Sequence, residues 1–350
     1  MNNNDWKLSS YDYNLPKELI AQRPAPNRDQ SRMLLLERKS GKIAHKNFTD
    51  IVSLLPRSSC LVINNTKVLP ARLNGFRKTG GKIEALLIEE NKNCEWRVKL
   101  TKSKRIKIGE EIDFCGGEIT AIAKKKLEES EWLLIFENSA NFKSQLEKFG
   151  LPPLPPYIGR KEVNSKLNEE DRNRYQTCFA SEPGAIAAPT AGLHFTPEII
   201  SKIKEKGIEI LEVTLHVGLG TFNSINNEDI TKHKMHSEFF SVPNETIKKI
   251  KFFKGNNKNI FCVGSTSMRV IETLAQNNFK KNTGWTDIFI YPPYKFKITD
   301  GLLTNFHLPK STLIILVSAF CGREFLLNSY NKAVIENYRF FSYGDCMLIL

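Results

Sequence analysis

Histidines are the side chains of this sequence best suited to proton transfer near neutral pH. Five of the six lie in about a third of the chain, at His194, His216, His233, His236 and His307. An imidazole titrates close to neutrality, so a group of imidazoles can take up and release protons during a reaction. Their clustering predicts a reaction centre in the C-terminal half of the chain.

His194 follows an unusual run of small residues. The stretch GAIAAPTAGLHFT (184–196) holds nine Gly, Ala, Pro or Thr residues. Such a run builds neither an amphipathic helix nor a packed strand, but it lets a ligand come close to the backbone. We expect a shallow floor for a flat ring, with Ala191 and Gly192 beneath the ring, Thr190 bonded to its edge and His194 at the rim.

Two glycine-containing junctions could complete a ligand site. In HVGLGTF (216–222) a predicted strand ends in a glycine turn, and strand ends are where α/β sheets bind ligands. In VGSTSMRVIE (263–272) a strand leads into a helix, whose free N–H groups suit a carboxylate or phosphate. An ordinary helix cap with an intrahelical Arg269–Glu272 pair is the alternative. The predicted ligand-binding residues are Thr190, Ala191, Gly192, Gly218, Gly220, Thr221, Gly264, Thr266, Arg269 and Asn305.

The segment HKMHSE offers a different chemistry. His233, His236 and Glu238 could be metal ligands, joined by His194 or His307, in a metal-dependent hydrolase. An exposed polar loop explains the same segment equally simply, and the spacing supplies no third and fourth ligand. Seven scattered cysteines without a C-x-x-C pair argue against a zinc knuckle and a disulfide framework.

Basic and aromatic residues point to an anionic partner. The net charge is +13, although a Lys-rich composition could have the same effect. The segment DRNRYQTCFA (171–180) combines Arg and Tyr, which stack on bases, with Gln, which reads base edges; a charged helix face is the alternative. The aromatic segment YRFFSYGDCML (338–348) predicts a packed end or a stacking platform. The predicted RNA-binding residues are Arg28, Arg32, Arg174, Tyr175, Gln176 and Tyr343.

The elements that position these residues fall into two parts of the chain with different secondary-structure patterns. Residues 71–148 show short β-type runs separated by turn signals, which favour a small antiparallel barrel, and 141–150 reads as a closing helix. After the proline-rich 151–160, helices alternate with strands, as in a mixed or parallel sheet. We therefore expect an α/β fold in which a large discontinuous α/β domain (1–70 and 151–350) carries an inserted β-barrel domain (71–150).

Composition sets the broad class of protein. The hydrophobic fraction is 41% and the charged fraction 25%, both ordinary for a globular protein. There is no signal-like apolar segment near residue 1, and the apolar run 313–322 is too short to span a bilayer. We expect a cytoplasmic protein that does not enter a membrane.

Together these segments resemble one family. The stretches DYNLPKELIAQRP, NRDQSRML, CLVINNTKVLPARL, RYQTCFA, GAIAAPTAGLHFT, LHVGLGTF, MHSEFF, VGSTSMRVIET, TDIFIYPPYKFKITDGLLTNFHLPKSTLIILVSAF and YRFFSYGDCMLI run in order from residue 11 to the end. They are similar to the S-adenosylmethionine:tRNA ribosyltransferase-isomerases of queuosine biosynthesis. The chain departs from the family's usual residues at Asn65, Ser265, Pro293 and Cys346, and Asn65 removes a carboxylate.

The resemblance implies a reaction. The ribosyl group of S-adenosylmethionine would be transferred to 7-aminomethyl-7-deazaguanine at the wobble position of tRNA and isomerised, releasing adenine and methionine and requiring no metal. The partner would be the tRNA anticodon loop, and the enzyme a cytoplasmic monomer. Because this chemistry needs proton-transfer groups with pKa near 7, the hypothesis assigns catalysis to His194, His216 and His307, with His236 and Glu238 as second candidates. A metal-dependent hydrolase and a non-catalytic RNA-binding module remain the alternatives.

Overall fold

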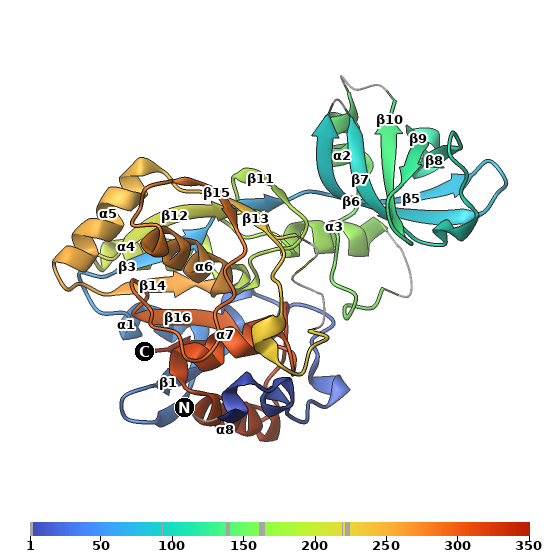
Figure 1. Ribbon diagram of the computed structural model, residues 1–350. Helices are drawn as coiled ribbons and strands as arrows, with labels where there is room; N and C mark the ends of the chain where they lie inside the picture. The colour runs from blue at the N-terminus through green and yellow to red at the C-terminus, as the bar shows by residue number, and fades with distance from the viewer. Residues whose placement is uncertain (1–2, 93, 138–140, 161–164, 219, 221–224) are drawn as a thin grey trace.

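The computed structural model describes residues 3–92, 94–137, 141–160, 165–218, 220 and 225–350. A large sheet flanked by helices forms one part of the molecule, and a small barrel projects from it (Figure 1). The predicted fold class, a large discontinuous α/β domain with an inserted antiparallel barrel, is confirmed.

Within the described residues, nine strands form the large sheet in the order β15-β13-β12-β3-β14-β16-β17-β1-β2. Its centre, β12-β3-β14-β16, is parallel, and β13, β15, β17 and β2 run antiparallel to a neighbour. The strands are β1 Arg32–Glu37, β2 Lys42–Asn47, β3 Cys60–Asn64, β12 Glu209–Leu215, β13 Glu238–Ser241, β14 Ile260–Val263, β15 Thr283–Thr286, β16 Gly301–Asn305 and β17 Cys346–Ile349.

Helices cover both faces of the sheet because the central strands are apolar on both sides. In β3, Cys60 and Val62 face one core while Leu61 and Ile63 face the other, as the alternation of a strand requires. Helices α5 to α8 contribute to the first core, and α1 and α4 to the second. Their bounds are α1 Ile51–Leu54, α4 Pro197–Glu205, α5 Asn244–Gly255, α6 Gly264–Gln276, α7 Thr312–Cys321 and α8 Arg323–Ile335.

The barrel has its own core. Its strands close in the order β10-β7-β6-β5-β8-β9, and helix α2 (Phe142–Phe149) packs Phe142 and Leu146 into the barrel core. The expected closing helix is thus present. The strands are β5 Arg72–Arg77, β6 Lys82–Lys92, β7 Glu95–Leu100, β8 Glu111–Phe114, β9 Ile119–Lys126 and β10 Glu131–Phe136. Helix α3 (Ser165–Arg174) and the small sheet of β4 (Thr66–Val68) and β11 (Glu182–Ala185) lie between the two parts (Figure 1).

Local sequence signals explain several boundaries. The Thr196 hydroxyl accepts a hydrogen bond from the Ile199 N–H (3.3 Å) and caps α4, and Gly207 follows the helix with φ +85°. The expected helix–strand–helix succession around β14 is likewise observed. The aromatic C-terminal segment ends as β17, between β16 and β1, and its aromatic side chains are buried, so the predicted packed end is confirmed.

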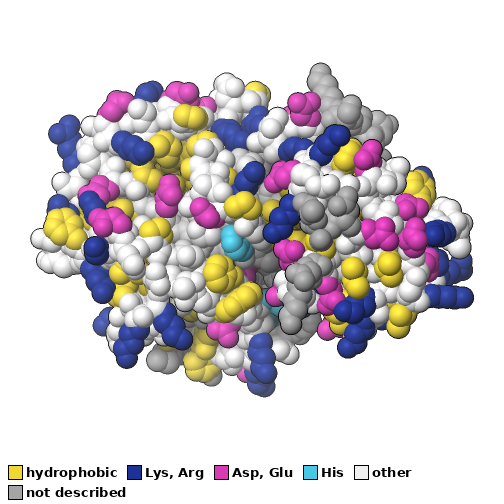
Figure 2. Space-filling model, turned by 90° about the horizontal axis from the view of Figure 1, so that it is seen from above, with side chains coloured by type: hydrophobic (Ala, Val, Ile, Leu, Met, Phe, Trp, Pro, Cys, Tyr) yellow, Lys and Arg dark blue, Asp and Glu magenta, His cyan; other side chains and the backbone are white. Residues whose placement is uncertain are grey.

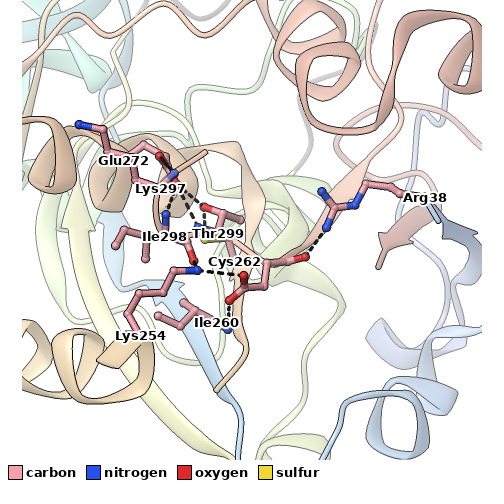
Figure 3. A network of polar contacts seen from close by, with 9 residues as sticks. Arg38, Lys254, Ile260, Cys262, Glu272, Lys297, Ile298 and Thr299 are labelled. Atoms are coloured by element: carbon pink, nitrogen blue, oxygen red, sulfur yellow. Dashed lines mark hydrogen bonds and ion pairs between the residues drawn. The ribbon is translucent and has the colours of Figure 1, made fainter. Parts of the chain in front are cut away.

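A buried carboxylate ties α6 to the segment entering β16. Glu272 is fully buried and accepts hydrogen bonds from the backbone N–H groups of Lys297, Ile298 and Thr299 at 2.9, 3.1 and 3.0 Å (Figure 3). The prediction that Glu272 could pair with Arg269 is therefore wrong. The structural reason is that a buried carboxylate needs several donors, and the backbone before β16 supplies them.

In the described part of the chain, no single helix is long and apolar enough to cross a membrane. Helices α7 and α8, joined at a bend of 115°, reach that length and composition only as a pair.

Candidate functional site

A cavity of about 180 Å³ opens at the carboxyl ends of β12, β14 and β16. Parallel strands of an α/β sheet bind ligands at this edge, because the loops that follow them converge there. The cavity is lined by Ala187, Ala188, Pro189, Thr190 and Ala191, by Gly264, Ser265 and Thr266 at the start of α6, by residues 304–311, and by Pro156, Tyr157, Tyr175, Val217, Leu313, Phe341 and Ser342.

Five of the predicted ligand-binding residues meet at this cavity. They are Thr190, Ala191, Gly264, Thr266 and Asn305. They come from three separate segments of the chain, so the sequence interpretation correctly identified segments that fold together. The small-residue run forms part of the cavity wall, as expected, but the last residues of the run do not line the cavity.

Gly192 and His194 turn away from the cavity. A Cβ atom at Gly192 would lie 2.8 Å from Thr177 Cγ2 and from the Phe179 ring, so this glycine is required by packing. His194 is 3% exposed and packs on Phe48. Neither residue lines the cavity, so the predicted floor beneath a bound ring extends only to Ala191.

His194 instead orients Asn305. The Asn305 side-chain amide lies 3.1 Å from the Phe341 carbonyl oxygen and 3.3 Å from that of Asp345, and carbonyl oxygens only accept, so Nδ2 must face them. The same nitrogen lies 3.1 Å from His194 Nε2, which therefore accepts, and Nδ1 of His194 donates to Ser31 Oγ at 2.8 Å. This network leaves the carbonyl oxygen of Asn305 as the free end of the amide.

Three residues of the cavity wall, Asn305, Thr266 and Tyr175, have a buried side-chain oxygen without a hydrogen-bond partner among the described residues. Among the described residues, neither Asn305 Oδ1 nor Thr266 Oγ1 has a partner. Leaving a buried polar atom unpaired costs about 1–3 kcal/mol, and such atoms in a native structure mark places where a ligand or water completes the bonding. Asn305 Oδ1 can accept from an N–H or O–H of a ligand, and Thr266 can donate to or accept from one.

His307 is the imidazole that lines the cavity. Nε2 lies 2.8 Å from Thr304 Oγ1, and the His307 backbone is held by the hydroxyls of Tyr330 (2.9 Å) and Tyr13 (2.6 Å). Burial lowers the pKa of His307 to about 3, and burial together with Arg28 and Arg339 lowers the pKa of His194 to about 3. Both rings are thus neutral at physiological pH, contrary to the expectation of groups with pKa near 7.

His216 and His236 lie outside the cavity wall. His216 Nδ1 is 2.8 Å from Thr66 Oγ1, its ring stacks on Phe239, and burial lowers its pKa against the opposing effect of Glu182. His236 is exposed, and its ring lies against Gly220. Of the imidazoles expected to meet in one cavity, His307 lines the cavity wall and His194 lies behind Asn305, while His216 and His236 lie elsewhere.

Glu238 and Arg269 form a buried ion pair. Arg269 donates to Glu238 Oε2 and, through Nε, to the Ile288 carbonyl at 3.3 Å, while Glu238 Oε1 accepts from the Gly218 N–H at 3.0 Å. Glu238 is therefore committed to Arg269 rather than to a metal with His233 and His236. Across the described residues, no group of three His, Cys, Asp or Glu side chains is arranged to hold a metal ion. Thr221 lies outside the described residues.

The predicted RNA-binding residues are used largely within the protein. Arg174 donates to the carbonyls of Ala25 (2.7 Å) and Pro26 (3.0 Å), and the Gln176 amide pairs with both backbone groups of Val68. Tyr175 and Tyr343 are 1% and 4% exposed. Both rings pack into the core of this region, and Tyr175 also lines the cavity.

Arg28 and Arg32 are also held by backbone carbonyls. Arg28 donates to Asn173 (2.7 Å) and Leu193 (3.2 Å), and Arg32 to Glu336 (2.7 Å) while lying over the Tyr338 ring.

The sequence suggested a stacking platform in the segment that holds Phe341, but it did not point to Tyr157 in the cavity wall. Tyr157 stacks on Phe341 with 4.7 Å between ring centroids, and the Tyr157 hydroxyl lies 2.6 Å from Ser342 Oγ. Both segments were noted, one as a proline-rich linker and the other as an aromatic end, but nothing in either indicates that they meet.

The fold and the cavity define an α/β protein with an inserted barrel and a ligand site at the carboxyl edge of its sheet. A family model described as queuosine biosynthesis protein matches residues 8–349. The chain belongs to this family.

Named relatives agree over nearly the whole chain. An S-adenosylmethionine:tRNA ribosyltransferase-isomerase of Sulfurihydrogenibium sp. is 50% identical, covering 98% of this chain and all of the relative, and that of Clostridioides difficile is 48% identical over 98% and 99%. The crystal structure of S-adenosylmethionine tRNA ribosyltransferase from Thermotoga maritima is 36% identical, covers 98% and 100% of the two chains, and superposes with a TM-score of 0.56.

Proposed function

We propose that this chain is an S-adenosylmethionine:tRNA ribosyltransferase-isomerase. It transfers the ribosyl group of S-adenosylmethionine to 7-aminomethyl-7-deazaguanine at the wobble position of tRNA and isomerises it, with release of adenine and methionine. Relatives that match over their full length are named for this activity, which supports the proposal. The observation in this chain that carries it is the cavity whose wall holds unpartnered oxygens, among them Asn305 Oδ1 and Thr266 Oγ1.

The cavity suits a heteroaromatic ring. Tyr157 and Phe341 contribute aromatic surface to the cavity wall, and Ala187, Ala188 and Ala191 contribute small side chains. A ring bound there can donate an N–H to Asn305 Oδ1, whose orientation the His194 network fixes. Adenine and 7-deazaguanine both carry such donors, so the same wall serves either the donor's base or the acceptor's.

The start of α6 suits an anionic group. The first-turn N–H groups of a helix have no intrahelical acceptor, and the helix dipole favours negative charge there. Gly264, Ser265 and Thr266 bring this terminus to the cavity wall. The methionine carboxylate of the donor or a phosphate of tRNA is the proposed occupant.

His307 is the proposed proton acceptor. The sulfonium of S-adenosylmethionine acidifies the neighbouring 5′ C–H bonds, so a nearby base can remove a proton while adenine departs. Burial keeps the His307 ring neutral, so a ring nitrogen can accept a proton, but its lowered pKa makes it a weak base, and the acidity of the C–H bond beside the sulfonium must drive the transfer. His194 acts as a positioning residue for Asn305, while catalytic roles for His216, His236 and Glu238 stay predictions, as do the monomeric state, the cytoplasmic location and the absence of a metal.

Product release tests the proposal directly. Labelled S-adenosylmethionine is incubated with the protein and tRNA that carries the 7-aminomethyl-7-deazaguanine precursor. We expect free adenine and methionine in step with a mass gain on the tRNA, and a kcat at least tenfold lower for His307→Gln. Adenine release without tRNA modification, or no release at all, would contradict the function.

A further inference from the structure

A second cavity, of about 300 Å³, lies where the barrel meets the large domain. We call it the seam pocket and define it by Arg28, Lys67, Glu147, Arg172 and Thr177. Glu147 belongs to α2 of the barrel part, Lys67 to β4, and Arg172 to α3. Tyr175 lines both the seam pocket and the cavity described above, so a single side chain belongs to both walls.

The seam pocket carries excess positive charge. Arg172 donates to the Glu147 and Gly150 carbonyls (2.8 and 2.5 Å), and Arg28 likewise bonds to carbonyls. Carbonyl partners hold a guanidinium in place without cancelling its charge. Lys67 lies 3.7 Å from Glu147, both half exposed, and such a surface pair is weak. Three cations therefore face one carboxylate.

Thr177 supplies an independent sign of a ligand. The residue is 5% exposed, and in the described part of the chain its hydroxyl has no hydrogen-bond partner. A buried hydroxyl without a partner is costly, so a group that accepts from it would be stabilised there. Beside three cations, the group that fits is an anion with several acceptor oxygens, such as a phosphate.

We propose that the seam pocket binds a backbone phosphodiester of the tRNA, next to the nucleotide in the main cavity. The inference rests on the proposed function. Phosphate contacts fix the register of a nucleic acid on a protein, and the shared Tyr175 wall places this contact beside the reaction site. Seen from above, the molecule shows Lys and Arg interspersed with Asp and Glu rather than one broad basic face (Figure 2). The proposal therefore assigns the electrostatic contact to a local site, the seam pocket, rather than to a broad basic surface.

Salt dependence tests the contact. Each phosphate contact on a single strand contributes about 0.7 to the slope of log affinity against log salt. Lys67→Gln should lower the magnitude of this slope by about 0.7 for an anticodon stem-loop, so its loss of affinity between 50 and 200 mM salt is about 2.6-fold smaller than that of wild type. Thr177→Val should weaken binding and leave the slope unchanged, because it removes a neutral donor.

The matched control is Lys78→Gln. Lys78 lies in the turn after β5 of the barrel and, like Lys67, pairs with a glutamate, Glu111, at 2.8 Å, but it does not line the seam pocket. Its slope should equal that of wild type. Glu147→Gln should strengthen binding several-fold, since it removes the carboxylate that competes with the phosphate.

Other outcomes overturn the inference. An unchanged slope for Lys67→Gln, with the thermal midpoint retained, refutes the phosphodiester contact. If Lys67→Gln weakens equilibrium binding of S-adenosylmethionine in the absence of tRNA, the pocket belongs to the donor. If Lys67→Gln abolishes calorimetric binding of inorganic phosphate and leaves the salt slope of stem-loop binding unchanged, the pocket binds a free anion. Adenine release by wild type is measured in parallel. If adenine is released but the salt slope of Lys67→Gln equals that of wild type, only this inference is refuted. If no adenine is released but the slope changes as expected, only the proposed function is refuted.

Discussion

Two buried imidazoles should make this protein sensitive to mild acid. In the folded chain His194 and His307 have a pKa of about 3, against an ordinary value of 6.5, because burial disfavours the charged ring. The unfolded chain binds protons at both rings below pH 6.5, whereas the folded chain stays neutral until about pH 3. Their contribution to stability is therefore complete above pH 6.5 and is lost progressively as the pH falls towards 3.

The size of the effect follows from linkage. Between pH 7 and pH 5 a group with an unfolded pKa of 6.5 takes up nearly one proton on unfolding, which lowers the free energy of unfolding by about 2 kcal/mol. The two rings together account for about 4 kcal/mol, a large part of the stability of an ordinary domain. Carboxylates also contribute to the pH dependence of the free energy of unfolding over this range. Variants of the two histidines are therefore needed to separate the imidazole contribution.

The assay is urea unfolding of wild type, His194→Gln and His307→Gln at pH 7 and pH 5, followed by circular dichroism. Each protein is compared with itself at the two pH values, so a lower absolute stability of a variant does not matter. We expect the loss on acidification to be smaller by about 2 kcal/mol in each single variant. His45→Gln, which alters an exposed histidine on β2, is the control and should lose as much as wild type.

Equal acid losses in wild type and in both variants would refute the reasoning. The folded rings would then titrate near 6.5, as the unfolded rings do. That result would also restore the expectation drawn from the sequence, that these histidines exchange protons near neutral pH.

Three further predictions concern packing and the cavity. Gly192→Ala should lower the free energy of unfolding by about 1–3 kcal/mol in urea melts, because its Cβ would lie 2.8 Å from Thr177. Glu238→Gln should lower it by about 3–5 kcal/mol by leaving the Arg269 charge buried and unpaired, as thermal unfolding would measure. Ala188→Leu should fill the cavity and weaken equilibrium binding of S-adenosylmethionine at least tenfold while the thermal midpoint stays within a few degrees.

Each has a matched comparison. Gly255→Ala, at a glycine with open space around the Cβ position, should not destabilise the protein. Lys249→Gln breaks an ion pair with Glu209 at the surface and should change the thermal midpoint far less than Glu238→Gln does. Ala180→Leu, outside the cavity wall, should leave donor binding unchanged. A variant that behaves like its comparison would contradict the corresponding argument.

The sequence by itself determined the elements and their order. Periodicity and end signals place α4, β12, β14 and α6, and short runs with turns predict the barrel, because these patterns depend on neighbours a few residues away. The carboxyl ends of parallel strands meet at one edge of a sheet, so the meeting of Ala191, Gly264 and Asn305 at one cavity also follows from the order of elements.

Only the tertiary structure decided where individual side chains point and what they bond. The direction of the His194 ring depends on Asn305, 111 residues away, and the role of Arg269 on Glu238, 31 residues away. Tyr175 and Gln176 are predicted RNA contacts in the sequence, and only the structure shows that Tyr175 is 1% exposed and that Gln176 bonds to Val68. Residue type limits which bonds a group can form, while burial and partners distant in the chain determine which bonds form and whether an imidazole carries charge.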